Sequence, residues 1–288
     1  DDTTMGQESF EQAESALLKN AVIRALTKAN KSAADVDFIM TGDLLNQCTG
    51  SCFALKDLEI AFIGMYGACS TMALTLCNSA MLIDAGAHCC VAGASSERQF
   101  RYPLEYGGQR PPTSQWTVTG AGAAVVVKNG NGPKIKAIHI GTITDLGIKD
   151  ANNMGAAMAP AAAKTISDFL DDTQTAADDY DLILTGDLGY TGSTLLHEVL
   201  ALEYHKNIKS VHNDCGLMIY DLKEQDVNSG GSGCGCSASV LCSHIMNKIN
   251  DGKYNRVLFV ATGALMSPTS AKQGQPIPGI AHAVLIEN

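Results

Sequence analysis

Cys69 is the residue of this chain best placed to do chemistry. It lies in the segment Gly67-Ala68-Cys69-Ser70-Thr71, directly before an apolar stretch of helical character. At the start of a helix, free backbone N–H groups and the helix dipole stabilise a thiolate, which is a strong nucleophile. Gly67 permits a tight turn into the helix, and Ser70 can cap it. The alternative is that Cys69 is a small residue that fits a crowded helix start, and spacing alone favours neither interpretation.

Polar side chains follow two strand-like segments of similar sequence. Asp43 and Asn46 come after the first segment, and Asp187 comes after the second. Binding sites of α/β proteins gather beyond the carboxyl ends of strands, so these three residues are candidate ligand contacts. Capping of their own loops is the alternative for each. His212 opens a polar run at 212–215, which forms either a pocket wall or a buried hydrogen-bonded network.

The segment 97–110 is the densest cluster of arginine and aromatic residues in an acidic chain. Its arginines and aromatic residues are Arg98, Arg101, Arg110, Phe100, Tyr102 and Tyr106. A guanidinium group presents a planar fork of donors that matches a carboxylate. Arg98 and Arg101 are therefore candidate contacts for an anionic ligand. The alternative is that the arginines pair with Glu97, with Glu105 or with a partner subunit.

The chain contains an internal repeat at half its length. Thr-Gly-Asp-Leu at 41–44 recurs 185 − 41 = 144 residues later, and 144 is half of 288. Related glycine-flanked segments hold Cys69 and Cys234, and each leads through a helical stretch to a hydrophobic strand. A single repeat of this length indicates a duplicated domain. We therefore predict two α/β halves, 1–132 and 133–288, that share one core.

Hydrophobic periodicity predicts the elements that carry these residues. Apolar side chains recur at helical spacing over about 8–30, and an apolar stretch at 70–84 predicts a helix that is buried on all sides. Short apolar runs predict strands at 36–44, 60–63 and 121–127.

Composition argues against several classes of protein. The formal charge is −10 at pH 7 and no basic tract is present, so nucleic acid is not an expected partner. No apolar run approaches the ~18 residues that span a bilayer, and no signal peptide is recognisable. The ten cysteines contain no Cys-x-x-Cys pair, and the seven histidines show no ligand spacing. We therefore expect reduced thiols and no metal site.

The surroundings of Cys69 resemble the thiolase and β-ketoacyl synthase III superfamily. The shared features are Gly-Ala-Cys-Ser at 67–70, a buried helix, a hydrophobic strand, and Thr-Gly-Ala-Gly-Ala-Ala at 119–124. The resemblance implies a thiolase-like five-layer α/β/α/β/α fold built from two duplicated halves. It also implies that Cys69 holds the position of the acyl-accepting nucleophile.

The resemblance does not extend to the rest of a condensing site. Condensing enzymes use a His and an Asn to stabilise the developing oxyanion, and the matching positions of this chain hold Asp187 and Cys234. The Cys-x-Gly region near the end of thiolases is replaced by Pro-Gly-Ile at 278–280. A carboxylate repels an oxyanion, so we do not expect condensation chemistry. Cys69 is then a vestigial nucleophile.

Longer strings resemble the stage V sporulation protein AD family within that superfamily. They include Thr-Gly-Asp-Leu-Leu-Asn-Gln at 41–47, Glu-Arg-Gln-Phe-Arg-Tyr-Pro at 97–103, His-Asn-Asp-Cys-Gly-Leu-Met-Ile-Tyr at 212–220 and Gly-Gly-Ser-Gly-Cys at 230–234. This resemblance implies that the chain binds dipicolinic acid and helps to load it, as its calcium chelate, into the developing spore. It implies no resident cofactor, and it leaves open whether calcium binds together with the ligand.

The family resemblance also sets expectations about partners and location. It implies a homodimer that works with other stage V sporulation proteins at the cytoplasmic face of the forespore or spore inner membrane. Attachment there would be peripheral, through protein contacts. It further implies a stretch upstream of residue 1 that contains the first strand of the first half.

We therefore expect a thiolase-like protein that binds a small aromatic dicarboxylate without catalysis. The expected ligand contacts are Cys69, Asp43, Asn46, Arg98, Arg101, Asp187, His212 and Cys234. Two alternatives stay open. One is an acyltransferase with Cys69 as nucleophile and His212 as base, and the other is an assembly scaffold with a vestigial pocket.

Overall fold

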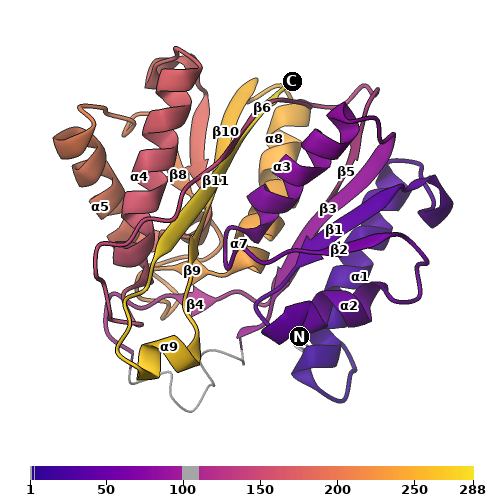
Figure 1. Ribbon diagram of the computed structural model, residues 1–288, viewed down its shortest axis with the longest axis horizontal. Helices are drawn as coiled ribbons and strands as arrows, with labels where there is room; N and C mark the ends of the chain where they lie inside the picture. Colours follow the sequence, from indigo (N-terminus) through magenta and orange to yellow (C-terminus); the bar gives the residue numbers. More distant parts are fainter. Residues whose placement is uncertain (1, 3, 99–109) are drawn as a thin grey trace.

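The computed structural model describes residues 2, 4–98 and 110–288, which form five layers of helices and sheets (Figure 1). Helices cover the outer face of each sheet, and further helices lie between the sheets. The outer helices are α1 (Phe10–Lys28) and α2 (Thr49–Leu55) on the first sheet, and α4 (Met154–Asp172) and α5 (Gly189–Glu203) on the second. The central helices are α3 (Thr71–Asp84) and α7 (Cys234–Ser239), which continues through a π-helical turn into α8 (Met246–Asn250). This arrangement confirms the α/β/α/β/α fold expected from the sequence.

The two sheets repeat one strand order. The first runs β2 (Phe62–Gly64), β1 (Phe38–Gly42), β3 (Cys89–Ser96), β5 (Gly120–Val127). The second runs β8 (His212–Asp214), β7 (Leu182–Thr185), β10 (Arg256–Ala264), β11 (Gly279–Glu287), β6 (Lys134–Ile140). In both sheets the first three strands are parallel and the fourth is antiparallel to the third. This shared topology agrees with the duplication read from the sequence, while the boundary at 132 stays a prediction.

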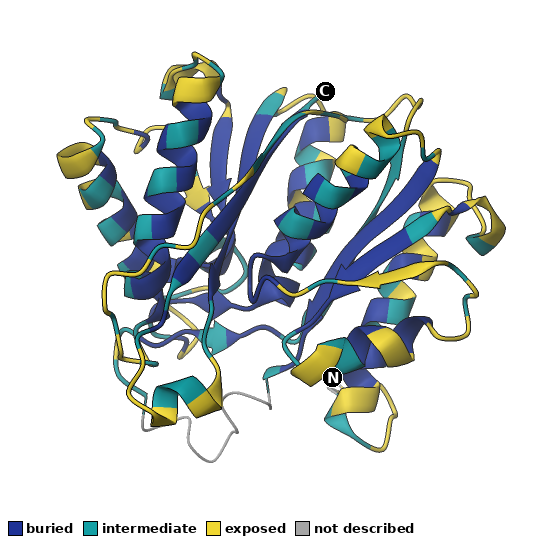
Figure 2. Ribbon diagram, viewed as in Figure 1, coloured by how far each residue is buried: buried dark blue, intermediate teal, exposed yellow. Residues whose placement is uncertain are grey.

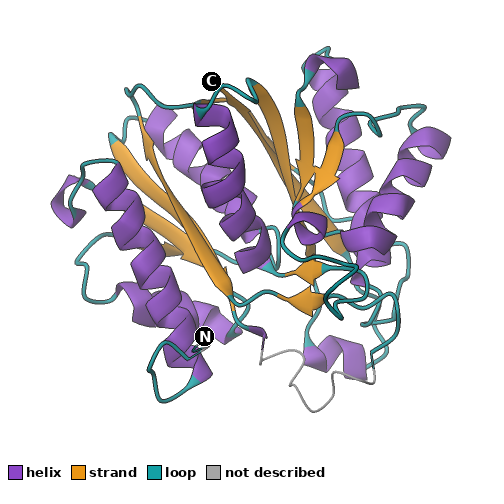
Figure 3. Ribbon diagram, turned by 180° about the vertical axis from the view of Figure 1, so that it is seen from behind, coloured by secondary structure: helices purple, strands orange, loops and turns teal. Residues whose placement is uncertain are grey.

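A short parallel strand pair connects the two halves. It consists of β4 (Trp116–Thr117) and β9 (Gly231–Ser232), and it lies at one end of both sheets (Figure 3). Gln115, just before β4, donates from Nε2 to the backbone oxygens of Asp187 and Gly231, at 2.7 and 2.8 Å. Two short helices complete the chain, α6 (Cys215–Met218) and α9 (Pro268–Lys272).

The predicted elements appear close to their expected bounds. The helix expected at 8–30 is α1, and the one expected at 70–84 is α3. The strands expected at 60–63 and 121–127 are β2 and β5. Each prediction came from the apolar pattern of its side chains; the layers bury one face of α1 and much of α3, whereas β2 is exposed.

The central layer brings apolar residues from distant parts of the chain into one cluster. The first turns of α3 are buried between the sheets, whereas Met81 and Asp84 near its end are exposed, so α3 is not buried on all sides along its whole length; Figure 2 shows this helix in dark blue, teal and yellow. Met72 and Leu76 of α3 belong to one apolar cluster with Leu241 of the π-helical turn and Phe259 of β10. Burial of about 25 cal/mol per Å² of apolar surface makes such a cluster a major stabilising term. The division into two halves that share one core stays a prediction.

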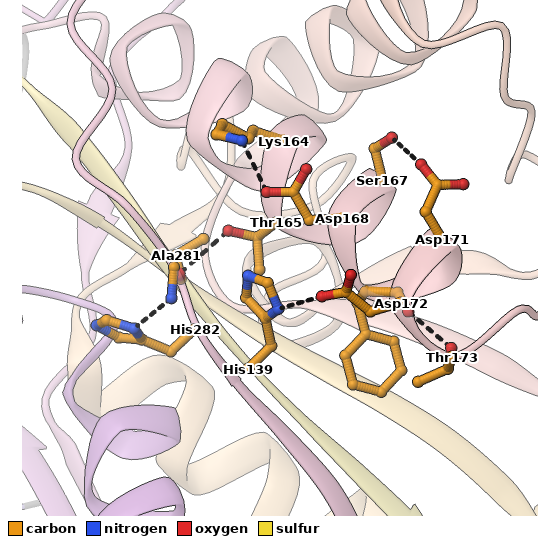
Figure 4. Close-up of polar contacts among 12 residues, drawn as sticks. His139, Lys164, Thr165, Ser167, Asp168, Asp171, Asp172, Thr173, Ala281 and His282 are labelled. Atoms are coloured by element: carbon orange, nitrogen blue, oxygen red, sulfur yellow. Dashed lines mark hydrogen bonds and ion pairs between the residues drawn. The ribbon is translucent and has the colours of Figure 1, made fainter.

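Strand β6 has no counterpart in the first sheet among the described residues, and it is fixed to α4 and β11 (Figure 4). His139 Nδ1 lies 3.8 Å from Asp172 Oδ2 at the end of α4. His282 of β11 is buried and accepts the Gly141 N–H on Nδ1 at 3.2 Å. Burial, with a smaller effect of His139, lowers the pKa of His282 to about 4, so His282 is neutral and its proton is on Nε2.

Gly263 of β10 allows the second half to reach the turn before α3. A Cβ at this position would lie 2.5 Å from the carbonyl oxygen of Gly67 and 3.1 Å from the backbone nitrogen of Ser70. Both are backbone atoms, which cannot move aside as the end of a flexible side chain can. The position of the Cys69 turn therefore depends on a residue of the other half.

The substitution Gly263→Ala tests this dependence. We expect it to lower the free energy of unfolding by about 1–3 kcal/mol, because the added methyl group overpacks a rigid site. Urea unfolding followed by circular dichroism measures the change. Gly132→Ala is the matched control, since nothing lies within 4 Å of its Cβ position. Equal stability of the two variants would contradict the close approach.

Candidate functional site

Three of the predicted ligand contacts meet in a buried centre where the two central helices begin. Cys69 directly precedes the start of α3 and is 2% exposed. Cys234 opens α7 and Asp187 follows β7, and both are fully buried. The Cys69 thiol forms a hydrogen bond to the Asp187 carboxylate, and Cys69 lies near enough to Cys234 to raise its pKa. We call these three residues the Cys69 centre.

The turn that carries Cys69 is tight and held by its own side chains. Ala68 has a φ of 49°, a left-handed conformation that costs a non-glycine residue roughly 1 kcal/mol or more. Ser70 Oγ donates to the Gly67 carbonyl at 2.6 Å, and Thr71 Oγ1 donates to the Ala68 carbonyl at 2.7 Å. The Gly67 N–H donates back to Thr71 Oγ1 at 3.2 Å. The tight turn expected at Gly67 is therefore confirmed, whereas the side chain of Ser70 makes no capping bond to α3 and binds the Gly67 carbonyl instead.

Asp187 is a buried carboxylate with donors on both oxygens. Oδ2 accepts from Ser232 Oγ at 3.0 Å and from the Gly233 N–H at 2.8 Å. Oδ1 accepts from Thr262 Oγ1 at 2.8 Å, and the Cys69 thiol is a further donor. Burial raises the pKa of Asp187, and its hydrogen bonds oppose that rise.

Cys234 fixes the start of α7 to the end of β3. Its thiol donates to the Ser95 carbonyl at 2.9 Å, and the Gly235 N–H donates to Ser96 Oγ at 3.1 Å. Gly233 precedes it with a φ of 102°, which favours glycine. Burial raises the pKa of Cys234 well above its ordinary value, and Cys69 adds to the rise, so this thiol stays protonated.

Asp43, the sequence counterpart of Asp187, occupies a different environment. It is fully buried, and its Oδ2 accepts the Ser51 N–H in the first turn of α2 at 2.7 Å. Its Oδ1 accepts the Leu45 N–H at 2.9 Å. These bonds are the ones expected if Asp43 caps its own loop, which is the alternative to a ligand contact. Asn46 lies in the loop before α2 and is exposed.

His212 makes its hydrogen bonds away from the Cys69 centre. Nε2 lies 2.9 Å from Thr185 Oγ1, and Nδ1 lies 3.0 Å from Nε2 of His197 on α5. Burial lowers the pKa of His212 to about 3, with a smaller effect of His197, so His212 is neutral. These contacts correspond to the buried network that the sequence left as an alternative to a pocket wall.

Asp214 is the member of this network nearest to the centre. Its Oδ2 accepts from Thr185 Oγ1 at 2.7 Å and the Leu188 N–H at 2.9 Å, and its Oδ1 accepts the Gly189 N–H at 2.9 Å. It therefore caps α5. Burial raises its pKa to about 7, while the hydrogen bonds oppose the rise. The sequence places Asp214 in a polar run but does not predict this capping role.

Arg98 and Arg110 both stack on Trp116. Their guanidinium carbons lie 4.3 and 4.0 Å from the centre of the Trp116 ring, within the range of a cation–π contact. Arg110 Nη2 also donates to the Asp226 carbonyl at 2.9 Å. Arg101, the other predicted arginine contact, lies outside the described residues. The aromatic partner of the two described arginines is thus Trp116, which the sequence analysis does not single out.

Glu14 is a buried acid outside the set of predicted site residues. It lies on α1, has 0% exposure, and accepts from Ser95 Oγ on Oε1 at 2.9 Å. Its position could have drawn attention, because it continues the buried row Leu18, Val22 and Leu26 at a spacing of four residues. A carboxyl group in an apolar row of a helix is unusual.

Other features of the described residues lie apart from this centre. A surface groove of about 520 Å³ between α1 and α2 is lined by residues that include Lys19 and Phe53, and by none of the predicted contacts. Within residues 2, 4–98 and 110–288, no three His, Cys, Asp or Glu side chains are grouped to hold a metal ion. No helix in the same part of the chain is long and apolar enough to cross a membrane.

The chemistry of the centre differs from that of an oxyanion site. Condensation requires donors that are free to meet a developing negative charge. Next to Cys69 stands Asp187, an acceptor whose oxygens are occupied by Ser232, Gly233 and Thr262. The arrangement is suited to holding two helix starts together.

Comparisons with known proteins agree with the fold and with the sequence strings. The family model described as Stage V sporulation protein AD matches residues 1–287. The Stage V sporulation protein AD of Bacillus subtilis (strain 168) is 46% identical over 293 residues, covering 100% of this chain and 86% of the relative.

Solved structures of condensing enzymes share the fold. The tetronic acid condensing enzyme AbyA1 is 17% identical with a TM-score of 0.63, covering 100% of this chain and 89% of that protein. The 3-oxoacyl-acyl-carrier-protein synthase III of Aquifex aeolicus is 14% identical with a TM-score of 0.60, covering 98% and 86%. OleA of Xanthomonas campestris is 11% identical with a TM-score of 0.63, covering 95% and 81%. At these identities the likeness shows a thiolase-like fold alone.

The substitution Asp187→Asn tests the structural role of this carboxylate. We expect it to lower the free energy of unfolding by about 1–3 kcal/mol. The amide nitrogen of the asparagine can only donate, and the groups around it are themselves hydrogen-bond donors, so at least one buried hydrogen bond is lost. Thermal and urea unfolding measure the loss. Asp178→Asn, at an exposed position, is the control and should change stability by less than about 0.5 kcal/mol. An Asp187 variant as stable as that control would show that the buried bonds contribute nothing.

Proposed function

The chain belongs to the stage V sporulation protein AD family, and on this premise we propose that it binds dipicolinic acid, or the calcium chelate of that acid, without catalysing a condensation. The binding would serve uptake of the acid into the developing spore. The observation that carries the absence of catalysis is the occupied Asp187 carboxylate beside Cys69. In this proposal Cys69 shapes the site and accepts no acyl group.

The arginine pair supports binding of an aromatic dianion next to the Cys69 centre. Dipicolinate carries two carboxylates on a planar ring, and a guanidinium group can bind a carboxylate through two parallel hydrogen bonds. Ser95 and Ser96 contact the start of α7, and Arg98 follows two residues later on the same segment. Arg98 therefore lies close along the chain to the centre, with its guanidinium held on Trp116. Arg98 is the cation that we assign to the ligand.

We place the protein at the cytoplasmic face of the forespore or spore inner membrane, where it would act with other stage V sporulation proteins. Attachment there would be peripheral and would use protein contacts. The scaffold alternative needs the same partners but no ligand. Binding of dipicolinic acid by the purified chain separates these two functions.

A homodimer would form along the free edge of β2. Within the part of the chain that the structure describes, this strand pairs with β1 on one side only and ends the first sheet. Its side chains are unusually apolar for an exposed edge, with Phe62 38% and Ile63 39% exposed. A twofold axis at this edge would pair β2 with β2 of a second copy in antiparallel fashion, which is a self-complementary contact.

Calorimetric titration with dipicolinic acid, with and without calcium, tests the proposed ligand. We expect saturable binding that isophthalic acid, which lacks the ring nitrogen, does not reproduce. Arg98→Ala should weaken the affinity roughly tenfold or more, because a charge-assisted hydrogen bond is lost. Arg24→Ala, an exposed arginine of α1, is the control and should bind as the parent does. No heat under either condition would rule out direct binding.

The strained turn at Ala68 is the observation that favours the acyltransferase alternative, because strain of this kind collects at functional sites. The intact mass of the purified protein after incubation with an acyl-CoA tests the acyltransferase alternative. A mass increase that Cys69→Ala abolishes would establish an acyl-enzyme and contradict the proposed absence of catalysis.

The substitution Ile63→Lys tests the dimer. We expect the parent to sediment as a dimer and the variant as a monomer, because lysines on an edge strand oppose strand pairing between copies. Ile23→Lys places the same charge at another exposed isoleucine, on α1, and should leave the dimer intact. A parent protein that sediments as a monomer at all concentrations would exclude the β2 contact.

A further inference from the structure

Glu14 has one carboxyl oxygen that nothing in the described part of the chain satisfies. Its Oε1 accepts from Ser95 Oγ at 2.9 Å, whereas Oε2 is buried and has no hydrogen-bond partner within residues 2, 4–98 and 110–288. The residue has 0% exposure, so bulk water does not reach it. A buried polar atom without a partner costs roughly 1–3 kcal/mol. A bound group that forms a hydrogen bond with Oε2 would remove this cost.

The groups around Glu14 are acids and a thiol. Asp43 faces it from the end of β1 and Glu97 from the end of β3, while Glu11 lies one turn earlier on α1. Cys234 faces it from α7. Burial and the negative charge of Asp43 raise the pKa of Glu14 to about 8. At pH 7 the folded protein therefore holds Glu14 mainly in its neutral form.

A neutral carboxyl group has one O–H donor. Because Oε1 already accepts from Ser95, the proton belongs on Oε2, the atom without a partner. A donor at this place requires an acceptor, and the strongest acceptor is an anionic oxygen. Burial can hold a carboxyl group neutral near pH 7 so that it donates a hydrogen bond of this kind.

A second feature places the missing acceptor beside the Cys69 centre. Ser95 joins the two sites, because its hydroxyl binds Glu14 and its carbonyl accepts the Cys234 thiol. Two buried hydroxyls on neighbouring elements, Thr41 of β1 and Ser51 of α2, also have no partner in the described residues. Glu14, Thr41 and Ser51, which all belong to the first half, thus each have a buried oxygen without a partner in the described residues; other such oxygens lie elsewhere, on Ser193 for example.

A metal ion is the less suitable occupant. The described residues contain no group of three His, Cys, Asp or Glu side chains arranged to bind one. A cation would also require Glu14 to be ionised, whereas its surroundings favour the neutral form.

We propose that Glu14 is a neutral acid of the ligand site and donates its Oε2 proton to a carboxylate oxygen of the bound anion. The identity of that anion as dipicolinate rests on the proposed function. The anion is then received by a proton already in place, in addition to Arg98. Binding requires the protonated form, so loss of that proton weakens binding.

The pH dependence has a definite sign. Below about pH 8 Glu14 keeps its proton and the affinity should be constant. Above that pH the affinity should fall about tenfold for each further unit, so that binding at pH 9 is about tenfold weaker than at pH 7. Deprotonation also places a carboxylate next to the anion, which acts in the same direction.

Calorimetric titration with dipicolinic acid at pH 7 and pH 9 provides the test. For the parent we expect the tenfold loss at pH 9. Glu14→Gln keeps an N–H donor but cannot titrate, so it should bind within a few-fold of the parent at pH 7 and lose the dependence on pH. Glu11→Gln, an exposed glutamate on the same helix, should keep the dependence. A parent affinity that is equal at both pH values, or a Gln variant that still loses tenfold, would overturn the proposal.

Urea unfolding between pH 5 and 8 tests the proton without any ligand. The pKa of Glu14 rises from 4.5 to about 8 on folding, so the parent should lose stability as pH rises through this window, and Glu14→Gln should lack that loss. If the free energy of unfolding depends on pH in the same way in the parent and in Glu14→Gln, Glu14 is not a neutral acid in the folded protein. A second outcome is that dipicolinate gives no heat at either pH while the pH dependence of unfolding differs between the parent and Glu14→Gln. The proposed ligand and its hydrogen bond to Glu14 are then wrong, but Glu14 is still a neutral acid. The two failures are therefore distinguishable.

Discussion

Asp187 is the residue on which the arrangement of the centre depends. A carboxylate without water is stable only where donors replace its hydration, so the segments that carry those donors must meet at one point. The donors come from Cys69 in the first half and from Thr262 and the 232–233 segment in the second. The starts of α3 and α7 are thereby placed against β7 and β10. The close approach of Gly263 to Gly67 adds a steric requirement at the same junction.

The duplication has produced two aspartates with different tasks. Asp43 and Asp187 follow equivalent strands in the repeated Thr-Gly-Asp-Leu segment. Asp43 binds backbone N–H groups of its own half and caps α2. Asp187 instead binds groups of both halves, from Cys69 to Thr262. The same residue type thus holds a local helix start in one half and a contact between the halves in the other.

The parts of the structure that follow from local pattern were predictable, and those that follow from distant contacts were not. The repeat and the apolar stretch at 70–84 led to the two sheets and the buried helix between them. Asp187, Cys69 and Cys234 could be brought together by the pseudo-symmetry of the halves. Glu14 could not, because its partner Ser95 is 81 residues away and periodicity does not reveal whether a buried carboxyl is charged. For the same reason the pairing of His212 with His197 was visible only in the structure.

The contact of two arginines with Trp116 has an optical consequence. Trp116 is the single tryptophan of the 288 residues, so the indole emission of the whole protein originates from one ring. That ring lies against the guanidinium groups of Arg98 and Arg110, and its electronic environment is set by two positive charges. The protein therefore carries an intrinsic chromophore at the place where its halves are joined. Its fluorescence reports on the geometry of that junction without any added label.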